Sequence, residues 1–265
     1  MYSLRLTCSA EQSEFISAEL WDAGTIAVRE MDADGRVLLI AGFETNAAVR
    51  DLLVRFGDYS PEWRAEAATD WVAETQAAWP PRSVGERLFL APAWSEEPTP
   101  AGRERVIHNP GSACGTGEHP CTQLALIALE RCVAPGCTVI DIGTGSGILA
   151  IAALRLGAAA AVGIDPDEAA LEAARENFAL NGLDAHLVVG SADCLAADCS
   201  DVTVVNISGT VLLSILDDLQ RATCPGGWLI LTGFPEAEAH VFERALPTSE
   251  TFGIGEWRCV VAKLS

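Results

Sequence analysis

Three glycines that alternate with other residues mark the stretch of this chain best suited to hold a cofactor. The stretch reads Val139-Ile140-Asp141-Ile142-Gly143-Thr144-Gly145-Ser146-Gly147-Ile148-Leu149-Ala150. An apolar, β-branched segment ends at an acidic residue, and an alanine-rich segment with helical character follows the glycines. Glycine suits such a turn because it adopts backbone angles that other residues avoid and lets a ligand approach the main chain. The pattern predicts a strand, a tight turn and a helix around a nucleotide-type cofactor.

The spacing of the glycines indicates which cofactor this is. A dinucleotide-binding turn has the pattern G-x-G-x-x-G, which would require a glycine where this chain has Ile148. The observed pattern, Asp-x-Gly-x-Gly-x-Gly, resembles motif I of the class I S-adenosylmethionine-dependent methyltransferases. A second expected strand ends about twenty residues later at Asp165, whose carboxylate can accept both ribose hydroxyls. The alternative is a glycine-rich turn in an α/β domain that binds no ligand.

The residues around this turn are expected to alternate between strands and helices. Strands are predicted at 137–142, 160–165, 185–190, 202–206, 227–232, 248–254 and 257–264, and helices at 147–157, 167–181, 209–222 and 235–246. This alternation implies an α/β, doubly wound, Rossmann-like domain with a mainly parallel sheet. No helix separates the last two strands, so they should form an antiparallel hairpin at one edge. That seven-stranded arrangement is typical of methyltransferases, and we place the domain at 103–265.

The N-terminal part of the chain has a different order of elements. Strands are expected at 2–8, 25–31, 36–43 and 63–67, and helices at 11–21 and 45–56. The order β-α-β-β-α-β predicts a small α+β, ferredoxin-like domain at 1–68. Residues 69–102 are interpreted as a linker that contains a helix and a hairpin. A glycine-rich loop at 109–119 precedes a helix at 120–132 and is a candidate lid or clamp.

The composition excludes several classes of function. A net charge of -20, with Lys263 as the only lysine, argues against binding of nucleic acid and suits a basic protein partner. The acidity could equally serve solubility or a salty habitat. Nine cysteines without C-x-x-C pairs indicate neither a disulfide framework nor a metal site. The chain shows no leader and no membrane-spanning run, so we expect a cytoplasmic protein, and we expect it to be a monomer.

Three further motifs narrow the class. They are the loop Gly115-Thr116-Gly117-Glu118-His119, the strand end Asn206-Ile207 and the closing Gly255-Glu256-Trp257. Together with motif I and the small N-terminal domain, they resemble the bacterial PrmA family of ribosomal-protein lysine methyltransferases, which modify the large-subunit protein of the stalk base. The resemblance implies S-adenosylmethionine as the cofactor, a ribosomal protein as the substrate and methylation of lysine or α-amino groups. It also implies that the N-terminal domain recognises the substrate.

Each candidate site residue has an expected role. Asn206 can accept a hydrogen from the substrate amine and orient its lone pair, although it could instead cap the following helix. His119 is either a catalytic group that helps to take the proton or a loop residue that only forms hydrogen bonds. The remaining candidates are cofactor-binding residues, for the methionyl group, the turn, the ribose and the adenine in that order: Thr116, Gly117, Thr122, Asp141, Gly143, Thr144, Gly145, Gly147, Asp165, Ser191 and Asp193.

The chain also departs from the family pattern at three positions. Cys114 and Cys121 replace a usual phenylalanine and threonine, and Ser208 replaces a common leucine. Because these positions should border the transfer site, they affect substrate identity more than cofactor binding. Three alternatives remain: a diverged methyltransferase acting on another protein or a small molecule, a catalytically inactive cofactor-binding interaction protein, and a nicotinamide-dependent oxidoreductase. Ile148 disfavours the last.

Overall fold

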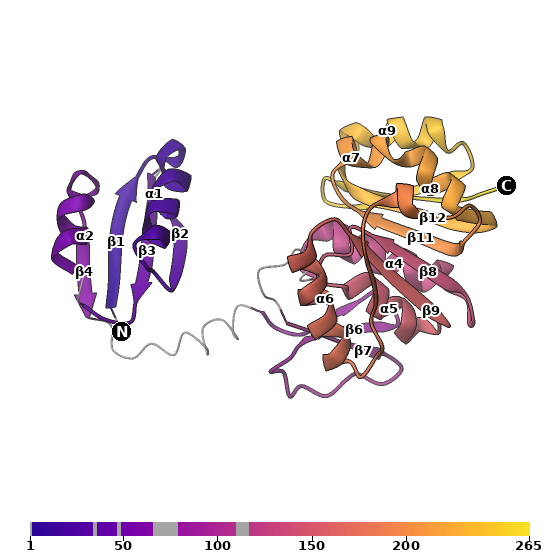
Figure 1. The fold of residues 1–265 in the computed structure, drawn as a ribbon, viewed down its shortest axis with the longest axis horizontal. Coiled ribbons are helices and arrows are strands. Elements are labelled where there is room, and N and C mark those ends of the chain that lie inside the picture. The colour runs from indigo at the N-terminus through magenta and orange to yellow at the C-terminus, as the bar shows by residue number, and fades with distance from the viewer. Residues whose placement is uncertain (1, 34–35, 47–48, 66–78, 110–116) are drawn as a thin grey trace. The chain divides into compact units, whose positions relative to one another are not determined.

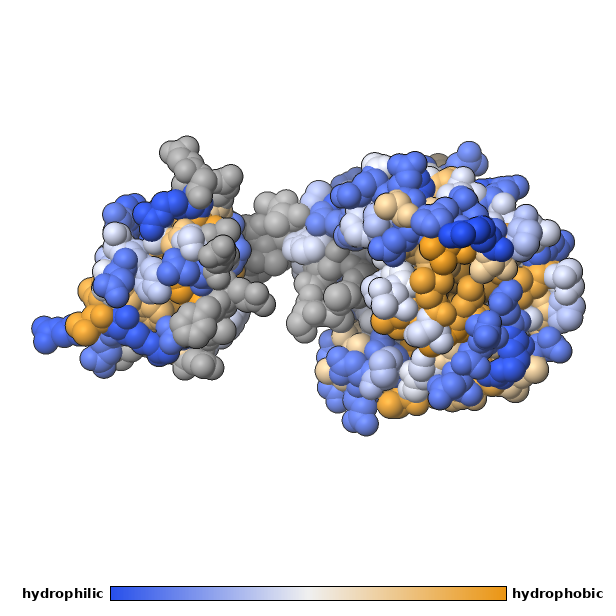
Figure 2. Space-filling model, turned by 90° about the horizontal axis from the view of Figure 1, so that it is seen from above, coloured by the Kyte–Doolittle hydropathy of each residue, from blue (hydrophilic) through white to orange (hydrophobic). Residues whose placement is uncertain are grey.

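The computed structural model of the chain describes residues 2–33, 36–46, 49–65, 79–109 and 117–265. The chain divides into two compact units, Met1–Ala77 and Ala78–Ser265, and Figure 1 shows the fold of each. Polar residues cover most of the face that Figure 2 shows, and hydrophobic residues come together in one area of the larger unit. No helix among the described residues is long and apolar enough to cross a membrane.

The smaller unit has the predicted ferredoxin-like order of elements. Its sheet has the strand order β2-β3-β1-β4, and all three neighbouring pairs are antiparallel. The elements are β1 (Tyr2–Cys8), α1 (Ala10–Asp22), β2 (Ala27–Ala33), β3 (Arg36–Phe43), α2 (Val49–Arg55), the 3-10 turn η1 (Gly57–Tyr59) and β4 (Glu62–Ala65). The α+β part of the predicted fold class is therefore confirmed.

The helices of the smaller unit bury only part of their expected apolar face. Ile16, Leu20, Leu52 and Phe56 lie in the core with residues of β1 and β3, as the helical spacing predicts. The apolar residues of the helix predicted at 11–21 also lead us to expect Trp21 in this core, but Trp21 is 54% exposed. It lies directly after the buried Leu20, and consecutive residues of a helix point in different directions. The prediction for Trp21 was wrong.

The larger unit contains a mainly parallel seven-stranded sheet, as predicted. The strand order is β10-β9-β8-β11-β12-β14-β13, with β14 antiparallel to both of its neighbours. The strands are β8 (Thr138–Ile142), β9 (Ala160–Asp165), β10 (His186–Val189), β11 (Ser200–Asn206), β12 (Thr223–Pro235), β13 (Ser249–Ile254) and β14 (Trp257–Lys263). Because the chain runs outward from β8 through β9 to β10 and then returns to β11, the order reverses between β8 and β11.

Helices cover both faces of this sheet (Figure 1). On one face lie α4 (Pro120–Cys132), α5 (Ile148–Leu156) and α6 (Glu168–Leu180), and on the other lie α7 (Gly209–Ser214), α8 (Leu216–Ala222) and α9 (Glu236–Ala245). Residues of β8 alternate between the two cores: Val139 packs on the first face and Ile140 on the second. The central strands β8 and β11 are apolar on both faces because both faces are buried, whereas the edge strands β10 and β13 are largely exposed.

One predicted helix is two helices in the structure. We expected a single helix at 209–222, but α7 ends at Ser214 and α8 begins at Leu216. The backbone of Ile215 leaves the helical region, and the Ser214 hydroxyl donates to the Val211 carbonyl at 2.7 Å. A serine that bonds a carbonyl in the preceding turn competes with the helical ladder.

The hairpin that we expected within the linker lies in the larger unit. It consists of β5 (Arg82–Val84) and β6 (Leu88–Pro92), and β7 (Glu104–His108) pairs in parallel with β6. Val84, Leu88 and Leu90 of this hairpin lie in the core of the larger unit. The side chain of Glu130 in α4 also holds the hairpin, because it accepts the backbone N–H groups of residues 86, 87 and 88 at 2.8, 2.8 and 3.0 Å. The expected linker helix falls largely outside the described residues.

Candidate cofactor and methyl-transfer site

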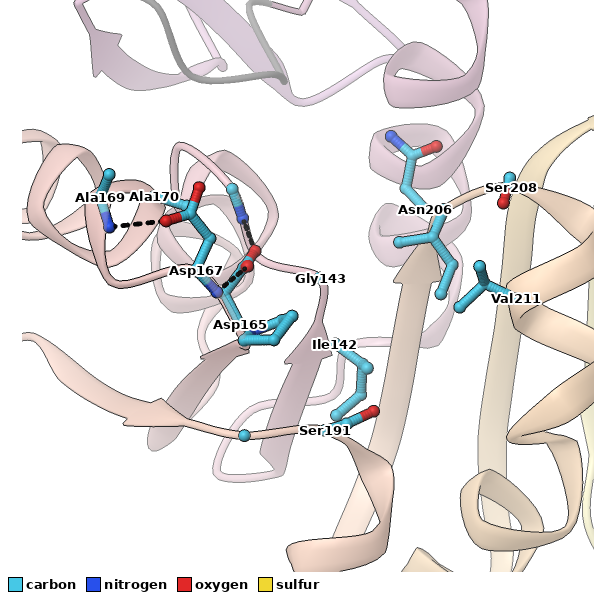
Figure 3. Close-up of a pocket in the computed structure, with 14 residues that line it drawn as sticks. Ile142, Gly143, Asp165, Asp167, Ala169, Ala170, Ser191, Asn206, Ser208 and Val211 are labelled. Carbon is cyan, nitrogen blue, oxygen red and sulfur yellow. Dashed lines mark hydrogen bonds between the residues drawn. The ribbon is translucent and has the colours of Figure 1, made fainter.

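A cavity of about 570 Å³ opens where the strand order reverses. Its walls are formed by the residues that follow β8, β9, β10 and β11, at the carboxyl ends of these parallel strands. This is the usual place for a ligand in an open α/β sheet. In Figure 3, Asp165 and Asp167 lie on one side of the cavity, and Asn206, Ser208 and Val211 lie on the other.

The glycine turn forms the floor between these walls. Gly143 and Gly145 line the cavity, and their φ angles of 70° and 51° lie in the left-handed region. A Cβ atom on Gly143 would overlap the side chain of Ile207. The turn is held to the neighbouring strand because Gly143 N and Thr144 N both donate to Ile164 O, at 2.8 and 3.1 Å.

Asp141 supports the turn from below and does not line the cavity. It is fully buried, and its Oδ2 accepts the Thr144 hydroxyl at 2.7 Å and the Ala150 N–H at 3.2 Å. Its Oδ1 has no hydrogen-bond partner among the residues that the structure describes. Burial raises the pKa of this carboxyl to about 7; the bonds from Thr144 and Ala150 oppose the rise, and the charge of Asp165 adds to it.

Asp165 is fixed by the backbone on either side of it. Gly145 N donates to its Oδ2 at 3.0 Å, and Asp167 N donates to its Oδ1 at 3.0 Å. Each carboxylate oxygen can accept a further hydrogen bond, so the group can still bind two hydroxyls. Asp167 caps α6 by accepting the Ala169 N–H at 2.9 Å. The carboxylate of Asp165, the acid identified in the sequence, is therefore held at the cavity in one orientation.

Asn206 stands at the end of β11, on the opposite wall. Its Nδ2 donates to the hydroxyl of the buried Thr122 at 3.2 Å. Ser208, and not Asn206, is the N-cap residue of α7, so the capping role considered for Asn206 has no counterpart in the structure. With its amide nitrogen engaged by Thr122, Asn206 has its carbonyl oxygen free to accept a hydrogen bond.

The residues that precede α4 pack near its N-terminus. His119 is the N-cap of α4, and its Nδ1 accepts the Cys121 N–H at 3.2 Å. The His119 ring lies 4.6 Å from the Trp257 ring in a T-shaped contact. Gly117 packs against Leu90, and Glu118 forms an ion pair with Arg82. His119 is exposed and does not line the cavity.

Asn177 of α6 and Asn181, the residue that caps the C-terminus of α6, join the turn to the strand that precedes the glycine-rich loop. The buried Asn177 donates to Ser146 O at 2.9 Å and accepts the Asn109 N–H at 2.7 Å. Asn181 accepts the Ile107 N–H at 2.9 Å and donates to Ile107 O at 2.7 Å. These two asparagine side chains therefore hold both the glycine turn and the first residue of the glycine-rich loop, Asn109, in place.

The structure brings together some of the predicted site residues and separates others. Those that line the cavity are Gly143, Gly145, Asp165, Ser191 and Asn206. Asp141, Thr144, Gly147 and Thr122 lie behind these residues, whereas Asp193 is exposed and outside the lining. Thr116 and Cys114 lie outside the described residues. The lining residues that we missed lie at or after the strand ends or belong to the helices beyond them: Ile142, Pro166, Asp167, Ala169, Ala170, Gly190, Ile207 and Val211.

The two departures that the structure describes occupy different environments. Ser208 lines the cavity beside Asn206. Cys121 is buried against β12, and this burial raises the pKa of its thiol despite hydrogen bonding with Thr232. Among the described residues, no three His, Cys, Asp or Glu side chains are grouped as metal ligands would be.

Comparison with known proteins gives consistent results. The family model described as ribosomal protein L11 methyltransferase (PrmA) matches residues 37–265. A ribosomal protein L11 methyltransferase of Dechloromonas aromatica is 44% identical over 208 residues, which cover 78% of this chain and 67% of that protein. Its counterpart in Symbiobacterium thermophilum is 39% identical over 186 residues, which cover 70% of this chain. That match spans 61% of the Symbiobacterium protein, about three fifths of its length.

Solved structures show the same fold. The ribosomal protein L11 methylase of Lactobacillus delbrueckii subsp. bulgaricus superposes with a TM-score of 0.61 at 32% identity, over 69% of this chain and 97% of that chain. A 16S rRNA methyltransferase of T. thermophilus, solved with AdoMet and guanosine, has a TM-score of 0.54 at 17% identity. The match with the rRNA enzyme covers 99% of this chain and 65% of that chain, and concerns the fold alone.

Proposed function

Because this chain belongs to the PrmA family of ribosomal protein L11 methyltransferases, we propose that it transfers methyl groups from S-adenosylmethionine to amino groups of a ribosomal protein. The observation that carries the proposal is the cavity with Asp165 on one wall and Asn206 on the other. Asp165 is suited to bind a ribose, and Asn206 is suited to bind an amine.

The cavity suits S-adenosylmethionine in size and in chemistry. Its volume of about 570 Å³ is in the range of small-molecule sites, roughly 300–1,000 Å³. The Asp165 carboxylate would accept the two ribose hydroxyls, and the exposed main chain of Gly143 and Gly145 allows close approach of the methionyl part. Apolar side chains of Ile142 and Val211 offer surfaces for a planar base.

The protein would promote methyl transfer mainly by orienting the substrate amine, and not by forming a covalent bond with the substrate. S-adenosylmethionine would supply a methyl group bound to a positively charged sulfur. The amine lone pair would form a bond to that methyl carbon while the carbon–sulfur bond breaks. Holding two reactants in such a geometry is worth roughly 7–11 kcal/mol. Asn206 would provide this aim by accepting an amine hydrogen through its carbonyl oxygen, while Thr122 fixes the amide through the bond at 3.2 Å. Thr122 is therefore a positioning residue.

The amine must lose its proton before the transfer. A lysine with a pKa of about 10.4 is neutral only about once in 2,500 molecules at pH 7, a cost of about 4.6 kcal/mol. An apolar wall and a nearby sulfonium charge both favour the neutral amine. We propose His119 as the proton acceptor, through the ring nitrogen that Cys121 N–H does not occupy. Because His119 does not line the cavity, the proton would reach it through a water molecule.

The substrate is inferred from the names of the relatives and from charge. Both relatives described above are named ribosomal protein L11 methyltransferases, and a net charge of -20 favours association with a basic protein. The N-terminal unit would recognise this substrate, and the larger unit would carry the cofactor. We also propose that the enzyme acts as a monomer and binds no nucleic acid directly.

Intact-mass spectrometry tests the proposal. Purified ribosomal protein L11 is incubated with the enzyme and S-adenosylmethionine, with Asn206→Ala as the transfer-deficient variant. The proposal predicts mass increments of one or more methyl groups with the wild type and few or none with the variant. Calorimetry should show cofactor binding by both proteins. An unmodified substrate in a sample that binds the cofactor would reject the L11 assignment and favour a diverged substrate or an inactive relative.

A further inference from the structure

A second cavity, of about 220 Å³, lies within the smaller unit. It is formed where the α1–β2 turn, the end of β3, α2 and β4 meet. Its lining combines apolar side chains with one acid: Ala23, Gly24, Ile26, Phe43, Glu44, Thr45, Leu52 and Trp63. We propose that this cavity binds a lysine or arginine side chain of the protein substrate. The inference rests on the proposed function, because it takes the cation from that substrate.

The aromatic wall of the cavity is held in place by neighbouring rings. Trp63 stacks on Tyr2 with ring centroids 5.7 Å apart and an interplanar angle of 17°, and its centroid lies 5.4 Å from that of Phe43. Tyr2 and Phe43 are themselves register partners on β1 and β3. The indole thus has little freedom to reorient. A preformed aromatic face is what cation–π recognition requires.

The α1–β2 segment of the lining is also fixed, although it is partly open to solvent. Ile26 N donates to Gly42 O at 2.9 Å, and the Thr25 hydroxyl donates to the same carbonyl at 2.7 Å. The Ile26 side chain is nevertheless 45% exposed, whereas Leu52 is 4% exposed. A large apolar residue held at the opening in this way offers contact to the aliphatic stem of a long side chain.

The negative charge of Glu44 favours a cationic side chain over an uncharged one in this cavity. Glu44 is exposed, and its carboxylate has no hydrogen bond or ion pair with the other described residues. No basic residue is among the cavity's lining residues. A lysine or arginine can lay its stem along Ile26 and Leu52 and bring its charged end to Trp63 and Glu44. An apolar side chain would gain no attraction from the Glu44 carboxylate, whereas a cation would form a charge-assisted hydrogen bond with it.

The indole N–H signal of Trp63 in the full chain provides a direct probe. We would record it during titration with N-acetyl-lysine methylamide and with N-acetyl-norleucine methylamide, which lacks the amine. The proposal predicts a shift with the lysine compound that Glu44→Gln removes, and little shift with norleucine. Asp58→Asn, at another exposed acid of the same unit, should leave the lysine-induced shift unchanged. Equal shifts with both compounds, or none with lysine, would overturn the proposal.

Kinetics with the protein substrate connect the cavity to methylation. Glu44→Gln should raise KM for ribosomal protein L11 about tenfold with kcat unchanged, and Asp58→Asn should leave both constants unchanged. If Glu44→Gln has the KM of the wild type, the cavity does not bind the substrate and the inference fails. If wild type methylates no L11, the proposed function fails instead, and the Trp63 titration alone decides whether the cavity binds cations.

Discussion

The buried carboxyl beneath the glycine turn makes stability depend on pH in an unusual direction. Burial raises the pKa of Asp141 from 3.8 to about 7. Between about pH 4 and pH 7 the folded chain therefore holds a proton at this site that the unfolded chain has lost. Stability falls with rising pH wherever the folded state binds more protons. The contribution of Asp141 should thus become less favourable as the pH rises through this window, by about 1.4 kcal/mol per unit.

Asp141→Asn removes the titration and keeps the shape of the side chain. The free energy of unfolding of the variant, relative to wild type, should rise by about 2 kcal/mol between about pH 5 and about pH 7, and level off above. The new amide nitrogen would occupy the place of Oδ1, which has no partner among the described residues. That unsatisfied donor costs about 1–3 kcal/mol at every pH, so the test is the slope and not the absolute difference.

Urea unfolding of the ligand-free protein across this pH range measures the slope. Asp201→Asn is the matched control, because Asp201 is exposed and also accepts a backbone N–H, that of Thr138 at 2.8 Å. The control should follow the pH dependence of wild type. A constant difference between Asp141→Asn and wild type across the range would refute the reasoning, since Asp141 would then be ionised in the folded protein as it is in the unfolded chain.

Three further predictions concern the site and its support. Asn206→Ala should lower kcat about 100-fold with the dissociation constant of S-adenosylmethionine unchanged, because the amine loses its alignment but the cofactor keeps its contacts. Steady-state kinetics measures kcat and calorimetry measures the dissociation constant; equal losses in both would argue against this role. Asp165→Ala should weaken binding of the cofactor about 100-fold or more, since a charged acceptor of two hydroxyls is lost; unchanged affinity by calorimetry would place the ribose elsewhere. Glu130→Ala should lower the free energy of unfolding by about 2 kcal/mol in urea, because three backbone N–H groups lose their acceptor; a change below about 0.5 kcal/mol would mean that water replaces the carboxylate fully.

Local patterns in the sequence predicted the parts of the fold that depend on local chemistry. The alternation of strands and helices predicted the seven-stranded sheet with its antiparallel edge, and the structure confirms both. Glycine spacing and the strand ends also identified Gly143, Asp165 and Asn206, which the structure brings to one cavity. Each of these residues lies at or next to the end of a parallel strand. They could be predicted because the fold class places these strand ends together at one edge of the sheet.

Contacts between distant segments could not be predicted in this way. The Thr122–Asn206 bond joins residues 84 positions apart, and the bonds of Glu130 to the β5–β6 turn span more than 40. No periodicity in the sequence encodes which buried hydroxyl meets which amide. The same limit explains why the hairpin was assigned to a linker. Its strands are short, and both its apolar residues Val84 and Leu88 and the Glu130 carboxylate attach it to the larger unit.

The most direct test of the account is a competition among natural substrates. The complete set of large-subunit ribosomal proteins from the source organism would be incubated with the enzyme and methyl-labelled S-adenosylmethionine, and the label in each protein quantified. We expect label in the amino groups of L11 and none when Asn206→Ala replaces the wild type. Label confined to another protein, or its absence in a preparation that binds the cofactor, would contradict it.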